Sequence, residues 1–504
     1  MQGTPYSTIK IIGYYIGKII TVLGLIQLLP LITSLIYREW IIVFNFIISM
    51  SISLILGSVL VITCNAGKKR KVEWSHGMII AAFSWFLGMF LCAIPYYLSG
   101  NYASFLDASF DVMSGFTTTG LVLIQDLDHV SNGINMWRHF LTYLGGQGMV
   151  VLALTFLVRS TSGSYRMYVG EAKDEKLLPN VVNTAKAIWY ISILYLIVGT
   201  LILWIMGIFI GLPIDRAFLH GLWVFMAAWS TGGFAPQTQN IMYYHSTWFE
   251  IATVIFFVIG SFNFALHYAV WNKNRKEIFK NIEIQSFTIT ATFFTILTLA
   301  GLMKLNVYPD FIATFRKGFY LLISGHTTTG FMTIYARQFF TEWGNMALLA
   351  VIISMLIGGS AASTAGGFKG LRMGIIFKGF IRDIKRILLP ESRIQIDKFH
   401  HIVDVILEEK HVRSAMLIVL AYIVTFAIGT LGGVFFGYPL SSAAFESASV
   451  TGNVGLSIGI TTPSMPNTLK IIYILIMWVA RLEFMSVLAL LTYLFYGMRR
   501  KWLR

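Results

Sequence analysis

Four short clusters rich in glycine, threonine and serine recur along the 504-residue chain. They read SGFTTTGL (114–121), WSTGGFA (229–235), SGHTTTGF (324–331) and SVTGNVGL (449–456), and the first and third share six of their first seven positions. In potassium channels, rings of backbone carbonyls from four loops replace the water shell of the ion. Glycine suits such a loop because it tolerates a positive φ and can turn its carbonyl inward. The indicated chemistry is coordination of a dehydrated cation.

The glycines of these clusters recur at long, similar intervals. Alignment places Gly120, Gly232, Gly330 and Gly455 in register, with separations of 112, 98 and 125 residues. Neighbouring residues would add carbonyls and, at the inner end, threonine hydroxyls. The predicted ion-binding residues are Thr118, Thr119, Gly120, Thr231, Gly232, Thr328, Thr329, Gly330, Asn453, Val454 and Gly455. A single cluster is better explained as a helix C-cap, but four at repeat spacing favour a pore.

The elements that must position these clusters are membrane spans. The chain is 56% hydrophobic and 12% charged, whereas a soluble domain is about a quarter charged. A span needs roughly 20 apolar residues. Ten runs reach that length, namely 11–36, 41–64, 77–98, 136–158, 185–211, 248–271, 286–306, 344–380, 412–436 and 470–496.

Each cluster ends a semi-apolar segment that is too short to cross a bilayer: 103–120, 217–234, 313–331 and 440–459. Irregular backbone at membrane depth must be buried in protein or line a cavity, so re-entrant segments are expected. The fold class is therefore an all-α polytopic membrane protein with ten spans, built from four repeats of span, loop and span around a central pore. The expected units are 1–70 (two peripheral helices), 71–160, 161–275, 276–390 and 391–504.

The net charge of +15 is explained by topology rather than by nucleic-acid binding. Ten spans place both termini on one side, and the loops on that side hold 29 lysines and arginines against eight in the opposite loops. Excess Lys and Arg mark cytoplasmic loops, so both termini are expected in the cytoplasm. Cys64 and Cys92 both lie in or beside apolar spans, which argues against a disulfide framework or a thiolate metal site.

Two features lie on the predicted cytoplasmic side of the clusters. The run 344–380 is too long for one straight span, and its segment 357–370 holds five glycines, which predicts a broken helix or, alternatively, close packing through small residues. Arg481 lies near the middle of the last run, where an arginine costs roughly 2.5–3.5 kcal/mol. Its candidate partners are loop carbonyls or Glu446. The alternatives are a barrier to cations and a structural ion pair.

These clusters, with GGQGMVVLAL (145–154), GGSAASTAGGFKGLRM (358–373) and ARLEF (480–484), resemble the Trk/Ktr/HKT superfamily of potassium transporters and, within it, the TrkH-type subunits. The resemblance implies that K⁺ is the transported ion, without an organic cofactor, and that the four glycines form a selectivity filter. It also implies an intramembrane gating loop that Arg481 contacts. The implied gating residues are Gly358, Gly359, Ser360, Ala361, Ala362, Ser363, Thr364, Ala365, Gly366, Gly367 and Arg481.

The resemblance further implies a lipid-embedded homodimer in the bacterial inner membrane, with a cytosolic nucleotide-binding regulatory subunit. The basic loops 159–186 and 368–413 are candidate docking sites, although topology explains their charge equally well. The sequence departs from the pattern of this family at two places. His326 is either a packing residue or a pH sensor, and the fourth cluster lacks a threonine run.

Two rival functions and one electrostatic feature remain open from the sequence. A proton- or sodium-coupled symporter would use the same pore, although the spans hold few acidic residues. A membrane-embedded enzyme is disfavoured because the histidines show no metal-binding spacing such as HExxH. Asp107, Asp111, Asp126 and Asp128 flank the first cluster and would make the outer mouth attractive to cations, unless they are ordinary loop acids.

Overall fold

The computed structural model of the chain describes residues 5–69, 72–148, 151, 181–388 and 396–502. Within these ranges the regular structure is helical, apart from one antiparallel hairpin formed by β1 (Lys398–His401) and β2 (Val403–Ile406). The prediction of an all-α membrane protein is confirmed. The second half of the predicted span 136–158 and most of the basic loop 159–186 lie outside the described residues.

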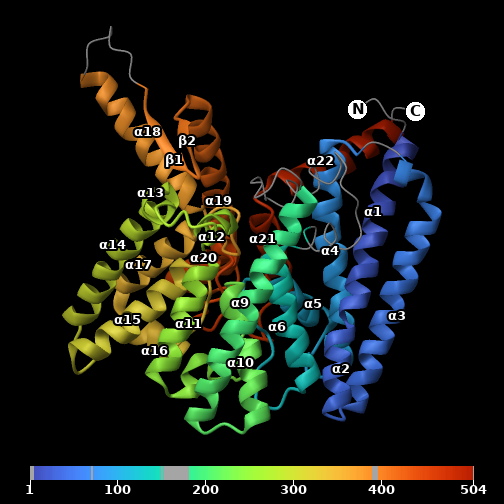
Figure 1. Cartoon of the computed structure of the whole chain (residues 1–504), viewed down its shortest axis with the longest axis horizontal. Coiled ribbons are helices and arrows are strands. Elements are labelled where there is room, and N and C mark those ends of the chain that lie inside the picture. Colours follow the sequence, from blue (N-terminus) through green and yellow to red (C-terminus); the bar gives the residue numbers. More distant parts are fainter. Residues whose placement is uncertain (1–4, 70–71, 149–150, 152–180, 389–395, 503–504) are drawn as a thin grey trace.

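The N-terminal helices form one edge of the molecule (Figure 1). They are α1 (Pro5–Ile26), α2 (Leu28–Ile36) and α3 (Trp40–Thr63), followed by the 3₁₀ turn η1 (Asn65–Lys69). Helices α1 and α3 approach closely at two glycines, since a Cβ added to Gly17 would lie 2.9 Å from the carbonyl oxygen of Gly57, and the reverse distance is also 2.9 Å. Small residues permit such contact between helices in a membrane, where burial in lipid offers no hydrophobic gain.

The rest of the chain repeats one pattern four times: a long helix, a short helix and a helix that breaks. The long helices are α4 (Trp74–Leu98), α9 (Val181–Ile210), α14 (Ile282–Lys304) and α19 (Glu409–Phe435). The short helices are α5 (Phe105–Phe116), α10 (Ile214–Trp229), α15 (Phe311–His326) and α20 (Leu440–Gly452). The first and third short helices begin at side-chain caps, Ser104 and Asp310, and the other two follow Pro213 and Pro439. These are ordinary helix-start signals.

The third helix of every repeat ends at nearly the same distance from the glycine cluster. These helices are α6 (Asn132–Gln147), α11 (Thr247–Gly260), α17 (Gly344–Ile357) and α21 (Asn467–Arg481). After the break, α12 (Phe264–Trp271), α18 (Gly370–Leu388) and α22 (Met485–Trp502) continue the last three. Short connecting elements are η2 (Asn240–Tyr244), α13 (Glu277–Lys280) and α16 (Ala336–Glu342).

These breaks revise the predicted spans. Among the described residues, six helical stretches are long and apolar enough to cross a membrane, and the first of them combines α1 and α2. They match 11–36, 41–64, 77–98, 185–211, 286–306 and 412–436. The runs 248–271 and 470–496 are instead helix pairs bent by 99° and 114°. The run 344–380 is interrupted between α17 and α18, as its glycines predicted.

The repeats close into a ring through one recurring contact. The third helix of each repeat packs against the short helix of the next: α6 on α10, α11 on α15, α17 on α20 and α21 on α5. The last of these contacts joins the fourth repeat to the first. The four glycine clusters, which end the short helices, are thereby brought to a common centre.

Candidate cation site at the centre of the four repeats

The short helices end in one shared backbone conformation. Each runs into a residue with a left-handed φ, namely Thr118 (55°), Thr231 (50°), Thr328 (57°) and Asn453 (54°). Two residues later comes a glycine with positive φ, namely Gly120 (85°), Gly233 (62°), Gly330 (83°) and Gly455 (95°). Positive φ values are uncommon outside glycine, so their recurrence at the same two positions shows that the four segments share one backbone conformation. We name the stretches 118–120, 231–233, 328–330 and 453–455 the glycine segments.

This geometry corrects the predicted alignment of the second repeat by one residue. The amide of Gly232 donates to the carbonyl of Ala227 at 2.8 Å, and the amide of Thr119 donates to that of Ser114 at the same distance. Gly232 therefore takes the place of Thr119, and Gly233 takes that of Gly120. Because Gly232 and Gly233 are adjacent, the sequence alone did not show which of them aligns with Gly120. The signal was the large apolar residue after each positive-φ glycine, which is Leu121, Phe234, Phe331 or Leu456.

The glycine segments form a closed ring of backbone. The Cα of each positive-φ glycine faces the carbonyl oxygen of the preceding position in the next segment. A Cβ built on Gly120 would lie 2.5 Å from the oxygen of Gly232, one on Gly233 2.0 Å from Thr329, one on Gly330 2.1 Å from Val454, and one on Gly455 2.1 Å from Thr119. The order runs through the repeats and returns to the first. Any side chain at these glycines would overlap backbone.

The threonine hydroxyls of the segments divide into two groups. Those of Thr119 and Thr329 each lie 2.8 Å from the hydroxyl of the threonine two residues earlier, at the helix end. The hydroxyls of Thr118, Thr231 and Thr328 instead meet the segment 358–367. The hydroxyls of the first group therefore point toward the ends of their own short helices, while those of the second group form the contact between the ring and the segment 358–367.

The stretch 358–367, which we name the intramembrane loop, lies against one side of the ring. Its Thr364 oxygens are 3.5 Å from the Thr118 hydroxyl and 3.2 Å from that of Thr231, and the Gly366 amide donates to the Thr328 hydroxyl at 2.8 Å. The base of the loop is closed by three backbone hydrogen bonds, from the amides of Phe368, Lys369 and Gly370 to the carbonyls of Leu356 (2.8 Å), Ile357 (3.0 Å) and Gly359 (2.8 Å). The loop is thus a compact, hydrogen-bonded segment.

Arg481 clamps the intramembrane loop at the end of α21. Its guanidinium donates to the carbonyl of Thr364 at 2.6 Å and to that of Gly145 at 2.9 Å. Of its two candidate partners, the loop carbonyl is therefore the one observed, and Glu446 is wrong. That carboxylate instead accepts the amides of Ile458 and Thr461 beyond the fourth segment.

A second basic residue, Lys369, was missed by the sequence reasoning. Its ammonium group is buried and donates to the carbonyl of Ala365 inside the same loop. The signal was the lysine in GGFKG, within the apolar run 344–380. Glu483, two residues after Arg481, pairs with Arg372 on α18. Lys369, Arg372 and Arg481 therefore all lie in the region of the intramembrane loop.

The acidic residues near the first segment are mostly engaged inside the protein. Asp107 forms a buried ion pair with Lys470 at 2.6 Å, and Asp111 accepts the Leu123 amide at 2.7 Å. The expectation that these two attract cations at an outer mouth is wrong, since burial and their partners occupy them. Asp126 remains exposed, beside His129.

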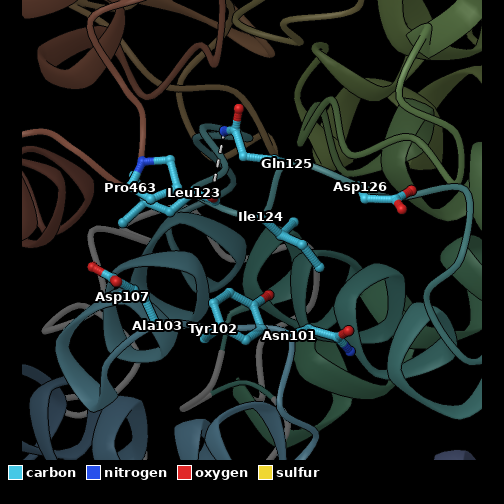
Figure 2. A pocket seen from close by; sticks show the side chains of 9 residues that line it. All are labelled: Asn101, Tyr102, Ala103, Asp107, Leu123, Ile124, Gln125, Asp126 and Pro463. Atoms are coloured by element: carbon cyan, nitrogen blue, oxygen red, sulfur yellow. Dashed lines mark hydrogen bonds between the residues drawn. The ribbon is translucent and has the colours of Figure 1, made fainter.

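A cavity of about 260 Å³ lies beside Asp107, the acidic residue of the buried ion pair with Lys470. Figure 2 shows Asp107 and Asp126 on opposite sides of it, with Pro463 of the fourth repeat at one edge. The cavity is therefore lined by residues of the first and fourth repeats.

His326 fits the packing alternative. It is fully buried, its Nε2 lies 2.8 Å from the hydroxyl of Thr290, and its ring meets Phe287 edge-on with centroids 4.7 Å apart. The equivalent residue of the first repeat, Phe116, packs against Trp85 in the same way. Both rings contact the long helix of their own repeat.

The chain is a multi-pass membrane protein in which four backbone segments close one ring, an arrangement suited to binding a small cation. Comparison with known proteins identifies its family. The model of the family TrkH, described as cation transport protein, matches residues 42–494. The chain belongs to this family. An uncharacterized cation transporter of Methanocaldococcus jannaschii, MJ1485, is 31% identical over 484 residues, covering 96% of this chain and 95% of the relative.

Two further relatives carry more specific names. The Trk system potassium uptake protein TrkG of Escherichia coli is 27% identical, covering 97% of this chain and 99% of the relative. The crystal structure of the potassium transporter TrkH from Vibrio parahaemolyticus superposes with a TM-score of 0.81 at 24% identity, covering 97% of this chain and all of that one. The resemblance stated from the sequence is confirmed, and these relatives are transporters rather than enzymes.

Proposed function

We propose that the chain mediates potassium uptake across the bacterial inner membrane, with the glycine segments as its selectivity filter. The observation that carries the proposal is the closed ring in which each positive-φ glycine faces a carbonyl of the next segment. Four loops of this kind supply oxygens in place of the hydration shell of K⁺. Relatives named as potassium uptake proteins, matched over nearly the whole chain, support the choice of ion.

The proposed ion-binding residues are those predicted from the sequence, with Gly233 added to the second segment. Backbone carbonyls carry the coordination, because the hydroxyls of Thr119 and Thr329 are turned toward the helix ends. The fourth segment reaches the same backbone shape with Asn453 in place of threonine. Its missing threonine run therefore leaves the proposed ring intact.

The intramembrane loop, Gly358–Gly367, is proposed as the gate. It bonds to three glycine segments, and Arg481 clamps it at Thr364. A fixed positive charge 4 Å from a cation raises its energy by about 4 kcal/mol at an effective dielectric constant near 20. Loop and arginine together thus form a steric and electrostatic barrier, which opening must move.

The proposed topology places both termini in the cytoplasm. Figure 1 shows the start of α1 and the end of α22 at the end of the molecule where the β1–β2 hairpin also lies. The excess of basic residues on that side fits a cytoplasmic location. We also propose a homodimer and a cytosolic nucleotide-binding regulatory subunit. The relatives' name, Trk system, supports association with other components of such a system.

Purified protein in a planar bilayer under defined ion gradients tests this function. A potassium-selective channel reverses at the potassium Nernst potential, which shifts by about 59 mV for each tenfold potassium gradient, whereas a proton- or sodium-coupled carrier shifts with the coupled ion. Growth of a potassium-uptake-deficient bacterium at low potassium gives the cellular readout. Absence of both growth rescue and potassium current from well-folded protein would overturn the proposal.

A further inference from the structure

One buried carboxylate touches the intramembrane loop from the cytoplasmic side. Glu283, in the first turn of α14, is 1% exposed, and its Oε1 accepts the Ala361 amide at 2.5 Å. Its Oε2 lies 3.5 Å from the side-chain amide of Asn263, in the break between α11 and α12. Glu283 thus joins the break of the second repeat to the loop of the third.

The same carboxylate faces the cytoplasmic hairpin. Nδ1 of His401, at the end of β1, lies 3.9 Å from Oε2 of Glu283. A second carboxylate six residues earlier holds the hairpin without touching the loop. Glu277 is 2% exposed, accepts the Ile402 amide at 3.1 Å and lies 3.0 Å from Nε2 of His400.

The hairpin is seated on its own small apolar cluster, separate from the main core. This cluster joins α14, α18, the hairpin region and α19, and consists of Ile282, Ile375, Phe399, Leu407, Val412 and Ala415. Ile282 directly precedes Glu283, so the apolar contact of the hairpin region and the contact to the loop lie side by side at the start of α14. The outward side of the hairpin leaves Val403 and Ile406 63% and 52% exposed.

We propose that Glu283 is a positioning residue that holds the intramembrane loop closed and links it to the cytoplasmic hairpin 398–406 through His401. The inference rests on the proposed gate. A hydrogen bond to an ionised acceptor is roughly twice as strong as a neutral one, so the carboxylate is a stronger anchor than an amide would be. His401 lies at ion-pair distance from Oε2, which the Asn263 amide also contacts, so displacing the hairpin removes one of the contacts to Oε2 and thereby loosens the bond to Ala361. Displacement of the hairpin on the cytoplasmic side is thereby transmitted to the gate.

Chemical labelling of a single loop cysteine measures the anchor directly. The chain has two cysteines, so Cys64→Ala and Cys92→Ala give a background into which Ala362→Cys is introduced. Ala362 is half-buried and next to the anchored amide. We expect a membrane-impermeant thiol reagent added on the cytoplasmic side to react at least fivefold faster in Glu283→Gln than in the parent, faster again in Glu283→Ala, and two- to fivefold faster in His401→Ala.

Glu277→Gln is the matched control. It changes an equally buried carboxylate at the same end of the repeat, and a glutamine oxygen still accepts the Ile402 amide, so the labelling rate is expected to stay within twofold of the parent. Thermal unfolding of each variant identifies any that fail to fold, and Glu283→Gln, which keeps the size of the side chain, carries the test if Glu283→Ala does not fold. Labelling of Glu283→Gln and His401→Ala within twofold of the parent would overturn the inference.

Potassium flux separates failure of this inference from failure of the proposed function. If the gate exists, Arg481→Ala raises flux, and Glu283→Gln raises it as well. If Arg481→Ala raises flux while Glu283→Gln changes neither flux nor labelling, the gate stands and the anchor is refuted. If no variant conducts potassium but labelling follows the expected order, the anchor stands and the proposed function is refuted.

Discussion

The corrected register of the second repeat makes one prediction that contrasts two adjacent glycines. Gly233→Ala places a Cβ 2.0 Å from the backbone oxygen of Thr329, whereas Gly232→Ala places one 1.8 Å from the side-chain oxygen of Thr142. Backbone in the ring cannot be removed by mutation, but a side chain can. We therefore expect Thr142→Gly to rescue Gly232→Ala and to leave Gly233→Ala impaired.

The magnitudes follow from the same contacts. Real Cβ contacts are essentially never shorter than 3.0 Å, so in Gly233→Ala the Thr329 carbonyl must move by about 1 Å, and the positive φ adds roughly 1–2 kcal/mol of strain. Gly232 has an ordinary φ, since it is absent from the positive-φ residues. Its rescue requires only the glycine in α6, which costs about 1 kcal/mol relative to alanine.

The assay is rubidium or potassium flux from proteoliposomes with sodium as competitor, normalised to monodisperse protein. For Gly233→Ala we expect discrimination between potassium and sodium to fall about tenfold, equivalent to 1.4 kcal/mol. The double variant Gly232→Ala with Thr142→Gly should stay within about threefold of the parent. Wild-type discrimination in Gly233→Ala, together with a non-functional double variant, would refute the corrected register.

Three further predictions concern the ring, the gate and the hairpin. Gly120→Ser should admit sodium or abolish uptake, because its Cβ would lie 2.5 Å from the oxygen of Gly232, and unchanged growth at low potassium in high sodium would contradict this. Arg481→Ala should raise flux per folded subunit several-fold by freeing the Thr364 carbonyl, whereas wild-type or lower flux from well-folded protein would refute the barrier. Hydrogen bonds to Glu277 and Asp404 raise the pKa of His400, so the hairpin gains stability below the ordinary histidine pKa near 6.5 and loses it as pH rises through the higher folded value. Hydrogen exchange of the Ile402 amide, corrected for its intrinsic pH dependence, should show greater protection at pH 6 than at pH 8.5, and His400→Ala should remove the difference.

Much of the fold was predictable because lipid imposes a simple rule on sequence. A continuous apolar run predicts a helix, since lipid cannot satisfy exposed backbone groups. Six of the ten predicted runs form helical stretches of membrane-spanning length in the described part of the chain. The bends in 248–271 and 470–496 were missed because an apolar run does not record where its helix breaks. Only in 344–380 did the glycines reveal the interruption.

The candidate site was predictable in kind but not in register. Threonine and glycine types indicated backbone coordination, and in three repeats the glycine chosen from the sequence is the one with positive φ. In the second repeat Gly232 and Gly233 satisfied the same pattern, and the structure distinguishes them by the positive φ of Gly233 and by the hydrogen bond from the Gly232 amide to Ala227. Glu283 was not predictable, because its partner Ala361 lies 78 positions away.

The position of the intramembrane loop follows from the repeat itself. The third helix ends 27 residues after the positive-φ glycine in three repeats, at Gln147 after Gly120, Gly260 after Gly233 and Ile357 after Gly330, and 26 residues after it in the fourth, at Arg481 after Gly455. Every repeat therefore opens its backbone at one level beneath the ring. In the third repeat this opening holds the loop, and in the fourth its last helical residue is the arginine that clamps the loop. The proposed barrier at that level thus needs no separate structural element, since the broken helices that close the ring already supply both the loop and the arginine.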